Sequence, residues 1–480
     1  MRPAYPELAL SVAGRWISAS SMRDCRPVIS PSTGETLAEL PCATDGDIDE
    51  ALAAAQAGFG VWRRIPAYER SQIVRRTGAL IRERRGELAG VIAHELGKPL
   101  GEAAREADTA AEMFEWAAEE ARRSYGRTIP GRSRGQHLEA MWEPVGPVAA
   151  FAPWNAPAIT PARKISSALA AGCSIILKAA EETPASAILI AKCAEAAGVT
   201  AGVLNLLFGD PQHISGRLLA SPVIKALTFT GSTQVGRQLA AQAGANLQRM
   251  TLELGGHAPV LIFADADIEA TATAAAAAKF RNAGQVCTSP TRFLVHASVY
   301  ERFVEGFSNA ARQLSIGDPF ASSTQMGPVQ NARRLEWMDR LTADASQHGG
   351  TLVTGGKQLG SRGFFWEPTV VADAAPDSLA SNEEPFGPLA LICSFESEEE
   401  ALQQANRLPQ ALAGYAFTHD ARIVAALRAE LNVGTLAINH FQASWPESPF
   451  GGRGASGFGV EGGVEGLQAF QQIKFISQMM

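Results

Sequence analysis

The chain has little cysteine, and the cysteine it has is scattered. Only six of its 480 residues are cysteines, at positions 25, 42, 173, 193, 287 and 393, and no two of them form a CxxC pair. Scattered thiols at this density indicate a reducing compartment and argue against a disulfide framework. The eight histidines form no HExxH or similar ligand spacing, so the sequence predicts no protein-bound metal.

The sequence also lacks a basic excess and a membrane-spanning segment. Its 42 Lys and Arg residues stand against 49 Asp and Glu residues, a formal net charge of −7, which disfavours non-specific nucleic-acid binding. The longest uncharged stretch, residues 144–162, holds five prolines and cannot form one continuous helix. The N-terminus shows no export signal. We therefore expect a cytoplasmic protein that binds neither nucleic acid nor membranes.

The hydrophobic pattern changes near residue 148. The first 125 residues predict mostly helix, with stretches from Asp47, near 69–94 and near 101–125, whose many charges we assign to solvated outer faces. From residue 148, short apolar runs begin about every 25 residues, which is typical of successive βα units and predicts a parallel sheet covered by helices. A second α/β segment follows, with strands expected near residues 291–296, 366–371, 388–394, 434–439 and 471–478.

Ligands of such sheets bind beyond the carboxyl ends of the strands, where this sequence is polar and rich in glycine. Gly231 begins a strand-to-helix turn that would let backbone N–H groups approach a phosphate. Residues 231–236 do not match the GxGxxG fingerprint, so an ordinary βα turn remains an alternative. Lys178 and Glu181 could hold the two hydroxyls of a ribose, and the carboxylate would repel a 2′-phosphate, which favours NAD over NADP. A solvated loop pair is the alternative.

Three residues could carry covalent chemistry. Cys287 lies just after a predicted helix end, in a glycine-containing loop of the kind that holds reactive groups. Glu253 ends a predicted strand before Gly255-Gly256 and could act as a general base. Asn155 could donate a hydrogen bond to a developing oxyanion. Each has a structural alternative, namely a buried thiol, an ion pair and an Asn turn.

Together these segments resemble the NAD(P)-dependent aldehyde dehydrogenase superfamily over essentially the whole chain. The matching segments, in the family's order, are PWNAP (153–157), KAAEETP (178–184), FTGSTQVG (229–236), LELGGHAP (252–259), FRNAGQVC (280–287), NEEPFGP (382–388) and PFGG (449–452). The resemblance implies an α/β fold with three parts. These are a parallel-sheet, Rossmann-like NAD-binding domain (1–123 and 143–252), an α/β catalytic domain (253–445) and a small β oligomerisation arm (124–142 and 462–480).

The resemblance also implies a role for each matching residue. Cys287 would attack the aldehyde, giving a thiohemiacetal and then a thioester; Asn155 would bind the oxyanion, and Glu253 would activate water. On the cofactor side, Lys178 and Glu181 would hold the adenosine ribose, Gly231 and Ser232 would lie by the pyrophosphate, Trp154 near the adenosine side, and Glu384 and Phe386 at the nicotinamide ribose and ring. The arm implies a homodimer or homotetramer.

Within the superfamily the chain is most similar to succinate-semialdehyde and 2-oxoglutarate-semialdehyde dehydrogenases. In that group, one Arg 15 residues before the ribose-binding Lys and another six before the Cys bind the substrate carboxylate, and Arg163 and Arg281 occupy these positions. Guanidinium groups suit a carboxylate because they bind it bidentately. Ser444 would also face the substrate tunnel. Ala156, where the family usually has Phe, would widen it.

The main hypothesis is thus an NAD-preferring, hydrolytic dehydrogenase of an ω-semialdehyde carboxylate, with NADP as the other cofactor. One alternative is a dehydrogenase of uncharged or aromatic aldehydes that use the space beside Ala156. A CoA-acylating enzyme would not need Glu253. A non-catalytic structural homologue is disfavoured because Cys287, Glu253 and Asn155 are all retained. A cysteine hydrolase lacks a histidine placed by sequence to serve Cys287.

Overall fold

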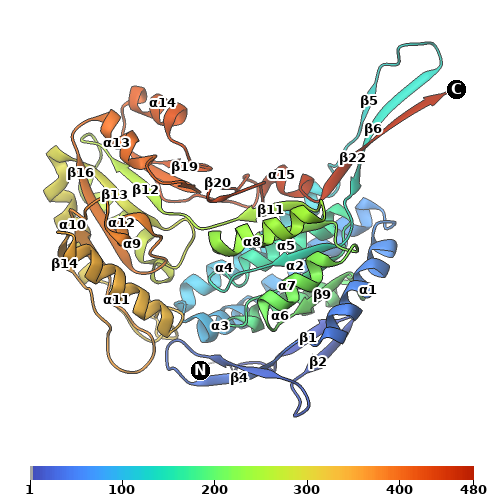
Figure 1. Ribbon diagram of the computed structural model, residues 1–480, viewed down its shortest axis with the longest axis horizontal. Helices are drawn as coiled ribbons and strands as arrows, with labels where there is room; N and C mark the ends of the chain where they lie inside the picture. The colour runs from blue at the N-terminus through green and yellow to red at the C-terminus, as the bar shows by residue number, and fades with distance from the viewer. Residues whose placement is uncertain (1–3) are drawn as a thin grey trace.

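The computed structural model describes residues 4–480, which form two sheets, each flanked by helices, and a protruding arm (Figure 1). The eight strands of the first sheet are, in spatial order, β2 (Arg15–Ser18), β1 (Ala9–Val12), β9 (Leu204–Leu207), β8 (Ile175–Lys178), β7 (Val148–Phe151), β10 (Ala226–Thr230), β11 (Arg249–Glu253) and β21 (Gly457–Phe458). The five strands from β9 to β11 are parallel. The predicted βα pattern from residue 148 is confirmed.

The first sheet is covered by eight helices. They are α1 (Asp45–Trp62), α2 (Ala67–Glu83), α3 (Arg85–Leu96), α4 (Leu100–Glu120), α5 (Ile159–Ala171), α6 (Pro184–Ala197), α7 (Pro211–Ala220) and α8 (Thr233–Ala245). Thr44 begins α1 with a reciprocal capping box to Asp47, which satisfies amide groups that a helix start leaves unpaired. The proline-rich stretch divides into β7, a loop and α5, as its prolines require.

The prediction for the first 125 residues was wrong in two respects. Residues 9–41 form four short strands, β1, β2, β3 (Cys25–Ile29) and β4 (Thr36–Pro41). Strands of four to six residues leave too little periodicity to recognise, and the β1–β2 turn is marked only by Ala13 and Gly14, both with positive φ. Several charged residues of the helices are also buried rather than solvated, among them Glu95 and Glu106.

The second sheet has seven strands and carries the remaining long helices. In spatial order its strands are β14 (Thr351–Thr354), β15 (Thr369–Ala372), β16 (Leu389–Phe395), β13 (Pro290–His296), β12 (Ala258–Ile262), β18 (Ala413–Phe417) and β19 (Thr435–Ile438). All but β14 are parallel to their neighbours. Its helices are α9 (Ile268–Phe280), α10 (Tyr300–Arg312), α11 (Ala332–Gln347), α12 (Leu379–Asn382), α13 (Glu398–Ala405) and α14 (Ala421–Glu430).

The arm is an antiparallel three-stranded sheet that projects from the body and ends at the C-terminus (Figure 1). It consists of β5 (Arg127–Ile129), β6 (Gln136–Pro144) and β22 (Gln471–Met479). Short elements complete the chain, namely the 3-10 turns at Arg281–Gly284 and Ala297–Val299, β17 (Gln410–Ala411), β20 (Arg453–Gly454) and α15 (Gly463–Gln468). Between residues 4 and 480, no helix is both long and apolar enough to cross a membrane. The exact domain limits given above stay a prediction.

Candidate active site

The predicted site residues gather at one edge of the first sheet. Asn155 follows β7, Lys178 ends β8, Gly231 follows β10 and Glu253 ends β11. Because these strands are parallel neighbours, their carboxyl ends lie side by side. Cys287 comes to this edge from the second sheet, in the loop between α9 and β13.

The backbone just before Cys287 has an unusual conformation. Asn282, Ala283 and Gly284 all have positive φ, at 51°, 52° and 72°. Residues other than glycine rarely adopt this backbone conformation. The turn is held from two sides. The Asn282 N–H donates to Glu102 Oε2 (3.1 Å), and the buried Gln285 side chain donates back to the Asn282 carbonyl (3.1 Å). The surrounding structure thus fixes where the thiol lies.

Asn155 is tied to the same turn. Its Nδ2 donates to the Gln285 carbonyl (3.1 Å), and its own carbonyl accepts from Asn282 Nδ2 (3.1 Å). An amide nitrogen carries two hydrogens, so one donor is left after the bond to Gln285. On the other side, a Cβ added to Gly256 would lie 2.7 Å from the Cys287 carbonyl oxygen. Only glycine therefore allows this close approach.

The Cys287 thiol is held neutral in this arrangement. Burial is the main cause that raises its pKa to about 12; the carboxylates of Glu384 and Glu253 act in the same direction, and the Arg163 guanidinium opposes them. The structure brings Cys287 close to Glu253, whose charge acts on the thiol, and close to Asn155, which is bonded to the preceding turn. The catalytic roles of these residues stay a prediction. The thiolate, which is the nucleophilic form, requires either a proton acceptor or the arrival of positive charge.

Glu253 is a buried carboxylate without a partner. Its side chain is 2% exposed, and neither oxygen accepts a hydrogen bond. Burial raises its pKa well above the ordinary value, the Glu461 carboxylate adds to this, and Lys164 and Arg163 oppose it. Leaving a buried acceptor unsatisfied costs about 1–3 kcal/mol, so this carboxylate is typical of a functional group rather than a structural one.

The two predicted ribose-binding residues form a pair. Lys178 Nζ donates to Glu181 Oε2 (2.7 Å), and the Gly209 N–H donates to Glu181 Oε1 (3.0 Å). The Gly231 N–H donates to the Glu253 carbonyl (3.0 Å), which sets the turn after β10 beside the end of β11. Ser232 is the N-cap residue of α8, and its side chain accepts a hydrogen bond from the Val235 N–H in the first turn of the helix.

Glu384 and Phe386 lie across from these strand ends. Burial is the reason that the pKa of Glu384 is raised to about 7. A hydrogen bond from the Gly256 backbone and the charges of Arg334 and Lys279 act in the opposite direction. A Cβ added to Gly255 would lie 2.5 Å from Glu384 Oε2. The rings of Trp154 and Phe386 touch edge to face, with centroids 5.4 Å apart. The positions predicted for them, Trp154 near the adenosine side of the cofactor and Phe386 at the nicotinamide ring, stay a prediction.

The chemistry of this edge suits a dinucleotide. Glu384 Oε1 is a buried acceptor without a donor, and ribose hydroxyls are donors. Lys178 and Glu181 supply a donor and an acceptor side by side, which matches the paired hydroxyls of a second ribose. The residues present therefore fit a nicotinamide dinucleotide.

Two of the predicted substrate residues meet. Arg163, 9% exposed, donates from Nη2 to Ser444 Oγ (3.1 Å) and lies over the Phe450 ring, 4.8 Å from its centroid. Its Nη1 lies 3.9 Å from a Glu461 carboxylate oxygen, and its Nε is buried without a partner. An unpaired guanidinium N–H is a donor available to an anionic ligand.

Arg281 and Ala156 lie apart from that cluster. Arg281 is exposed, at the end of α9, and its charge acts on Tyr415, whose hydroxyl donates to the Thr288 carbonyl next to Cys287 (2.6 Å). Ala156 is partly exposed, directly after Asn155. The structure records no contact between Arg163 and Arg281 among the residues it describes.

Sequence reasoning missed two residues that support the site, Lys98 in the loop before α4 and Glu106 on α4. Lys98 pairs with Glu106, and Glu106 accepts from the Ala158 N–H at the start of α5 (2.9 Å). Lys98 also donates to the Asn155 carbonyl (3.4 Å). The only available signal was an acidic residue on the apolar face of the helix 101–125, which helical spacing could have shown.

Comparison with known proteins agrees with this geometry. The Aldehyde dehydrogenase family matches residues 16–476. The chain is 45% identical over 472 residues to the 4-(hydroxymethyl)benzenesulfonate dehydrogenase TsaD1 of Comamonas testosteroni, covering 98% of each chain. It is 38% identical to the succinate-semialdehyde dehydrogenase GabD of Escherichia coli, whose name specifies NADP(+), with coverage of 97% and 96%. The crystal structure of a succinate-semialdehyde dehydrogenase from Burkholderia pseudomallei has a TM-score of 0.96 and 39% identity, covering 98% of both chains.

The chain therefore belongs to the aldehyde dehydrogenase family. The predicted superfamily, its semialdehyde-oxidising relatives and its α/β fold are confirmed. Members of this family oxidise small aldehydes with NAD or NADP, and the comparisons place this chain among them without choosing between the two cofactors.

Proposed function

We propose that the protein oxidises an aldehyde to a carboxylic acid through a thioester on Cys287. The observation that carries the proposal is the unpaired Glu253 carboxylate, buried beside a cysteine whose backbone turn is bonded to Asn155. A general base, a nucleophile and an oxyanion donor in one cleft are what acyl chemistry on an aldehyde requires.

In the first half of the reaction, Cys287, once its thiol has lost its proton, attacks the aldehyde carbon as the thiolate, and the carbonyl oxygen becomes an oxyanion. The free Nδ2 hydrogen of Asn155 and the Cys287 N–H stabilise that oxyanion, an effect typically of about 3 kcal/mol per donor. A nicotinamide dinucleotide bound by Lys178, Glu181 and Glu384 would supply the hydride acceptor for the oxidation of the tetrahedral carbon. The aldehyde carbon is thereby oxidised by two electrons, and a thioester on Cys287 remains.

In the second half, Glu253 takes a proton from water, and the resulting hydroxide attacks the thioester. The bond to sulfur breaks, the acid leaves and the Cys287 sulfur is free again. Burial keeps the pKa of Glu253 high, so this carboxylate is a stronger base than an exposed one. This role for Glu253 makes water the acceptor of the acyl group and CoA unnecessary.

For the substrate we propose an aldehyde with an anionic group at its far end. Support comes from Arg163, whose buried Nε has no partner and whose Nη2 is bonded to Ser444. Arg281 is proposed as a second, outer positive charge. The main candidates are ω-semialdehyde carboxylates of the succinic or 2-oxoglutaric type, in line with the relatives that carry semialdehyde names.

A second candidate is an aromatic aldehyde that carries a sulfonate or carboxylate. Ala156 leaves room for a ring beside Asn155. The relative TsaD1, whose name specifies a benzenesulfonate, is 45% identical to this chain. The same Arg163 would then bind the sulfonate, since guanidinium groups bind both kinds of oxyanion.

For the cofactor we propose a preference for NAD. The Glu181 carboxylate, already paired with Lys178, would repel a 2′-phosphate. NADP is the alternative, as in GabD.

We further propose a cytoplasmic location, supported by six cysteines that are all free thiols.

The assembly is proposed to be a homodimer or homotetramer built through the arm. Large apolar side chains are exposed on it, including Ile473 (59%), Phe475 (60%) and Met479 (63%). Exposed apolar surface of this kind marks a contact with another chain.

The test is NADH formation by the purified protein with NAD, across aliphatic and aromatic aldehydes with and without a terminal anion. We expect kcat/KM to be about a hundredfold higher for the anionic members, near 2.7 kcal/mol. Arg163→Met should raise KM for these substrates and hardly change it for uncharged ones. A flat profile that the variant leaves unchanged would contradict the proposed anion site. Comparing succinic semialdehyde with 4-sulfobenzaldehyde decides between the two candidates.

A further inference from the structure

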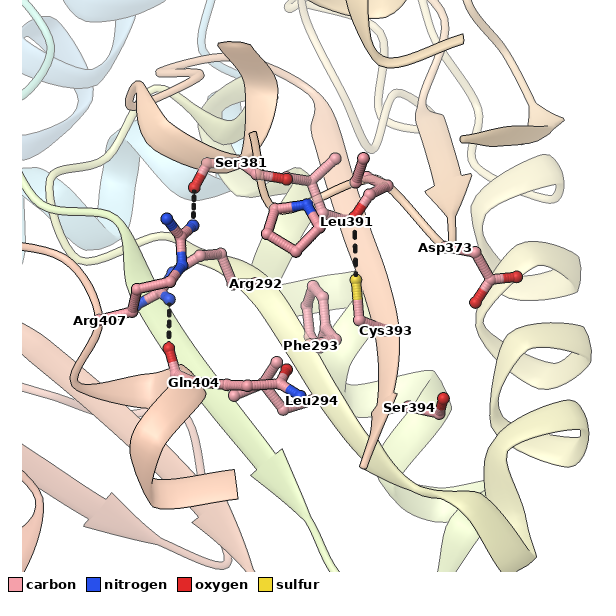
Figure 2. A pocket seen from close by; sticks show the side chains of 13 residues that line it. Arg292, Phe293, Leu294, Asp373, Ser381, Leu391, Cys393, Ser394, Gln404 and Arg407 are labelled. Carbon is pink, nitrogen blue, oxygen red and sulfur yellow. Dashed lines mark hydrogen bonds between the residues drawn. The ribbon is translucent and has the colours of Figure 1, made fainter. Parts of the chain in front are cut away.

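A cavity of about 320 Å³ lies over β13 and β16, between α12 and α13. Figure 2 shows two arginines, Arg292 and Arg407, toward one end of it and Asp373 at the other. None of the residues assigned to substrate or cofactor lines this cavity.

Arg292 is a buried cation without a counter-ion. It is 6% exposed, and its guanidinium donates to three neutral backbone carbonyls, those of His257 (3.0 Å), Gln404 (2.9 Å) and Ala405 (2.9 Å). Burial, together with the charge of the nearby Arg407, lowers its pKa to about 10. The side chain is therefore still charged at neutral pH, and burying a charge is costly unless an opposite charge joins it.

Arg407 adds a second positive charge at the same end. It donates to Asn382 Oδ1 (2.7 Å) and to the Ser381 carbonyl (2.8 Å). Across residues 4–480, neither Arg292 nor Arg407 forms an ion pair with a carboxylate. A guanidinium has five N–H donors, so both side chains keep donors that the protein does not use.

The rest of the cavity would not repel an anion at that end. The single carboxylate, Asp373, lies across the cavity and accepts from the Tyr300 hydroxyl (2.6 Å). Cys393 lies between Asp373 and the arginines, and burial raises the pKa of its thiol to about 11, so the thiol is neutral. The lining thus carries one net positive charge.

We propose that this cavity binds a small oxyanion, a carboxylate or a phosphate, between Arg407 and Arg292. Two convergent guanidinium groups with unused donors, in a space larger than such an anion needs, are what oxyanion recognition requires. The anion supplies the negative charge that the buried Arg292 lacks. This proposal stands apart from the proposed function, because it concerns binding at a different place.

The two arginines are linked to the active site along the chain. Arg292 donates to the His257 carbonyl, and His257 follows Gly256, which lies against the Cys287 carbonyl. Arg407 donates to the Ser381 carbonyl, three residues before Glu384.

The test is calorimetric titration of the full-length protein, saturated with NAD to occupy the cofactor's phosphate site; anion binding at Arg163 would be the same in every variant below. Inorganic phosphate and malonate are the two probes. We expect at least one of them to bind, and Arg407→Gln to weaken that binding at least tenfold. Arg428→Gln, which removes an exposed arginine on α14, is the matched control and should bind as the wild type does. The stronger probe identifies the ligand as a phosphate or a carboxylate.

A second variant covers the case in which Arg407→Gln is poorly folded by thermal unfolding. Cys393→Phe fills the cavity and leaves both guanidinium groups in place, and it should also abolish binding. Failure of both probes to bind the wild type would overturn the proposal. Equal binding by the wild type, Arg407→Gln and Cys393→Phe would overturn it as well. Neither result depends on whether the protein oxidises an aldehyde.

Discussion

At the scale of single residues, the cleft contains carboxylates that the protein does not pair. Both oxygens of Glu253 and Oε1 of Glu384 are buried without hydrogen-bond partners. Carboxylates elsewhere in the interior are satisfied, as in Glu95, which accepts from Ser186, Ala185 and Tyr5. The difference separates groups that hold the fold from groups held ready for a ligand or a reaction.

The Cys287 thiol should respond to the charge of Glu384. Because the Glu384 carboxylate raises the pKa of Cys287 and is itself ionised above about pH 7, Glu384→Gln should lower the pH at which the thiol becomes reactive. The rate of iodoacetamide alkylation, measured against pH without cofactor, reports this. In the wild type the rate should still be rising at alkaline pH.

Cys287→Ala provides the blank for that experiment, since five other cysteines are present. The shift should appear only in the signal that Cys287→Ala removes. An unchanged alkylation profile in Glu384→Gln would show that this carboxylate does not act on the thiol.

At the scale of elements, the turn before the nucleophile is the most constrained part of the chain. Gly284 has φ of 72°, and a Cβ there would lie 2.1 Å from the Gly387 carbonyl oxygen. Gly284→Ala should therefore move the Cys287 loop and reduce kcat at least tenfold, or about 1.4 kcal/mol. Gly86→Ala, in α3 with no atom near the added Cβ, should leave kcat unchanged.

Thermal unfolding of the same two variants completes this prediction. The Gly284→Ala change also costs stability, because the new side chain meets backbone rather than a flexible neighbour. Full activity in Gly284→Ala would mean that the turn does not position the thiol.

The sequence predicted the elements that carry a strong hydrophobic pattern. The strands β7, β8, β9 and β10 were found because each is a short buried run before a helix. The four N-terminal strands were missed because each has only four to six residues, and the burial of β2, β3 and β4 is mixed, so they show neither helical nor strand periodicity. The helix expected near 69–94 is two helices that break at Arg84, where no proline or glycine marks the end.

The site was predicted by motif more than by local chemistry. The strand-end positions of Glu253 and Asn155 already implied that these two residues lie at one sheet edge, whereas the approach of Cys287 from the second sheet was suggested only by the resemblance to a family. The pair Arg163–Ser444 spans 281 residues, and only the resemblance to a family could suggest it. The Lys98–Glu106 support of Asn155 was missed because a buried ion pair on a helix looks like surface charge in sequence.

At the scale of the whole molecule, the arm should decide the oligomeric state. Ile473 and Phe475 lie on one face of β22 and are exposed. Phe475→Asp should lower the mass measured by light scattering, because a charge would be buried in the apolar contact. Gln472→Asp, on the opposite face, should leave the mass unchanged. A wild-type mass equal to one chain at all concentrations would contradict an assembly built through the arm.

The central claim, a thioester on Cys287 that Glu253 hydrolyses, is tested most directly by mixing enzyme and NAD rapidly with a good aldehyde substrate. Glu253→Gln should release about one NADH per subunit in a fast burst and then stall, because hydride transfer precedes the step that needs the base. Cys287→Ala should release none while still binding NAD. A Cys287→Ala enzyme that turns over, or a Glu253→Gln enzyme with wild-type steady-state rates, would contradict the account.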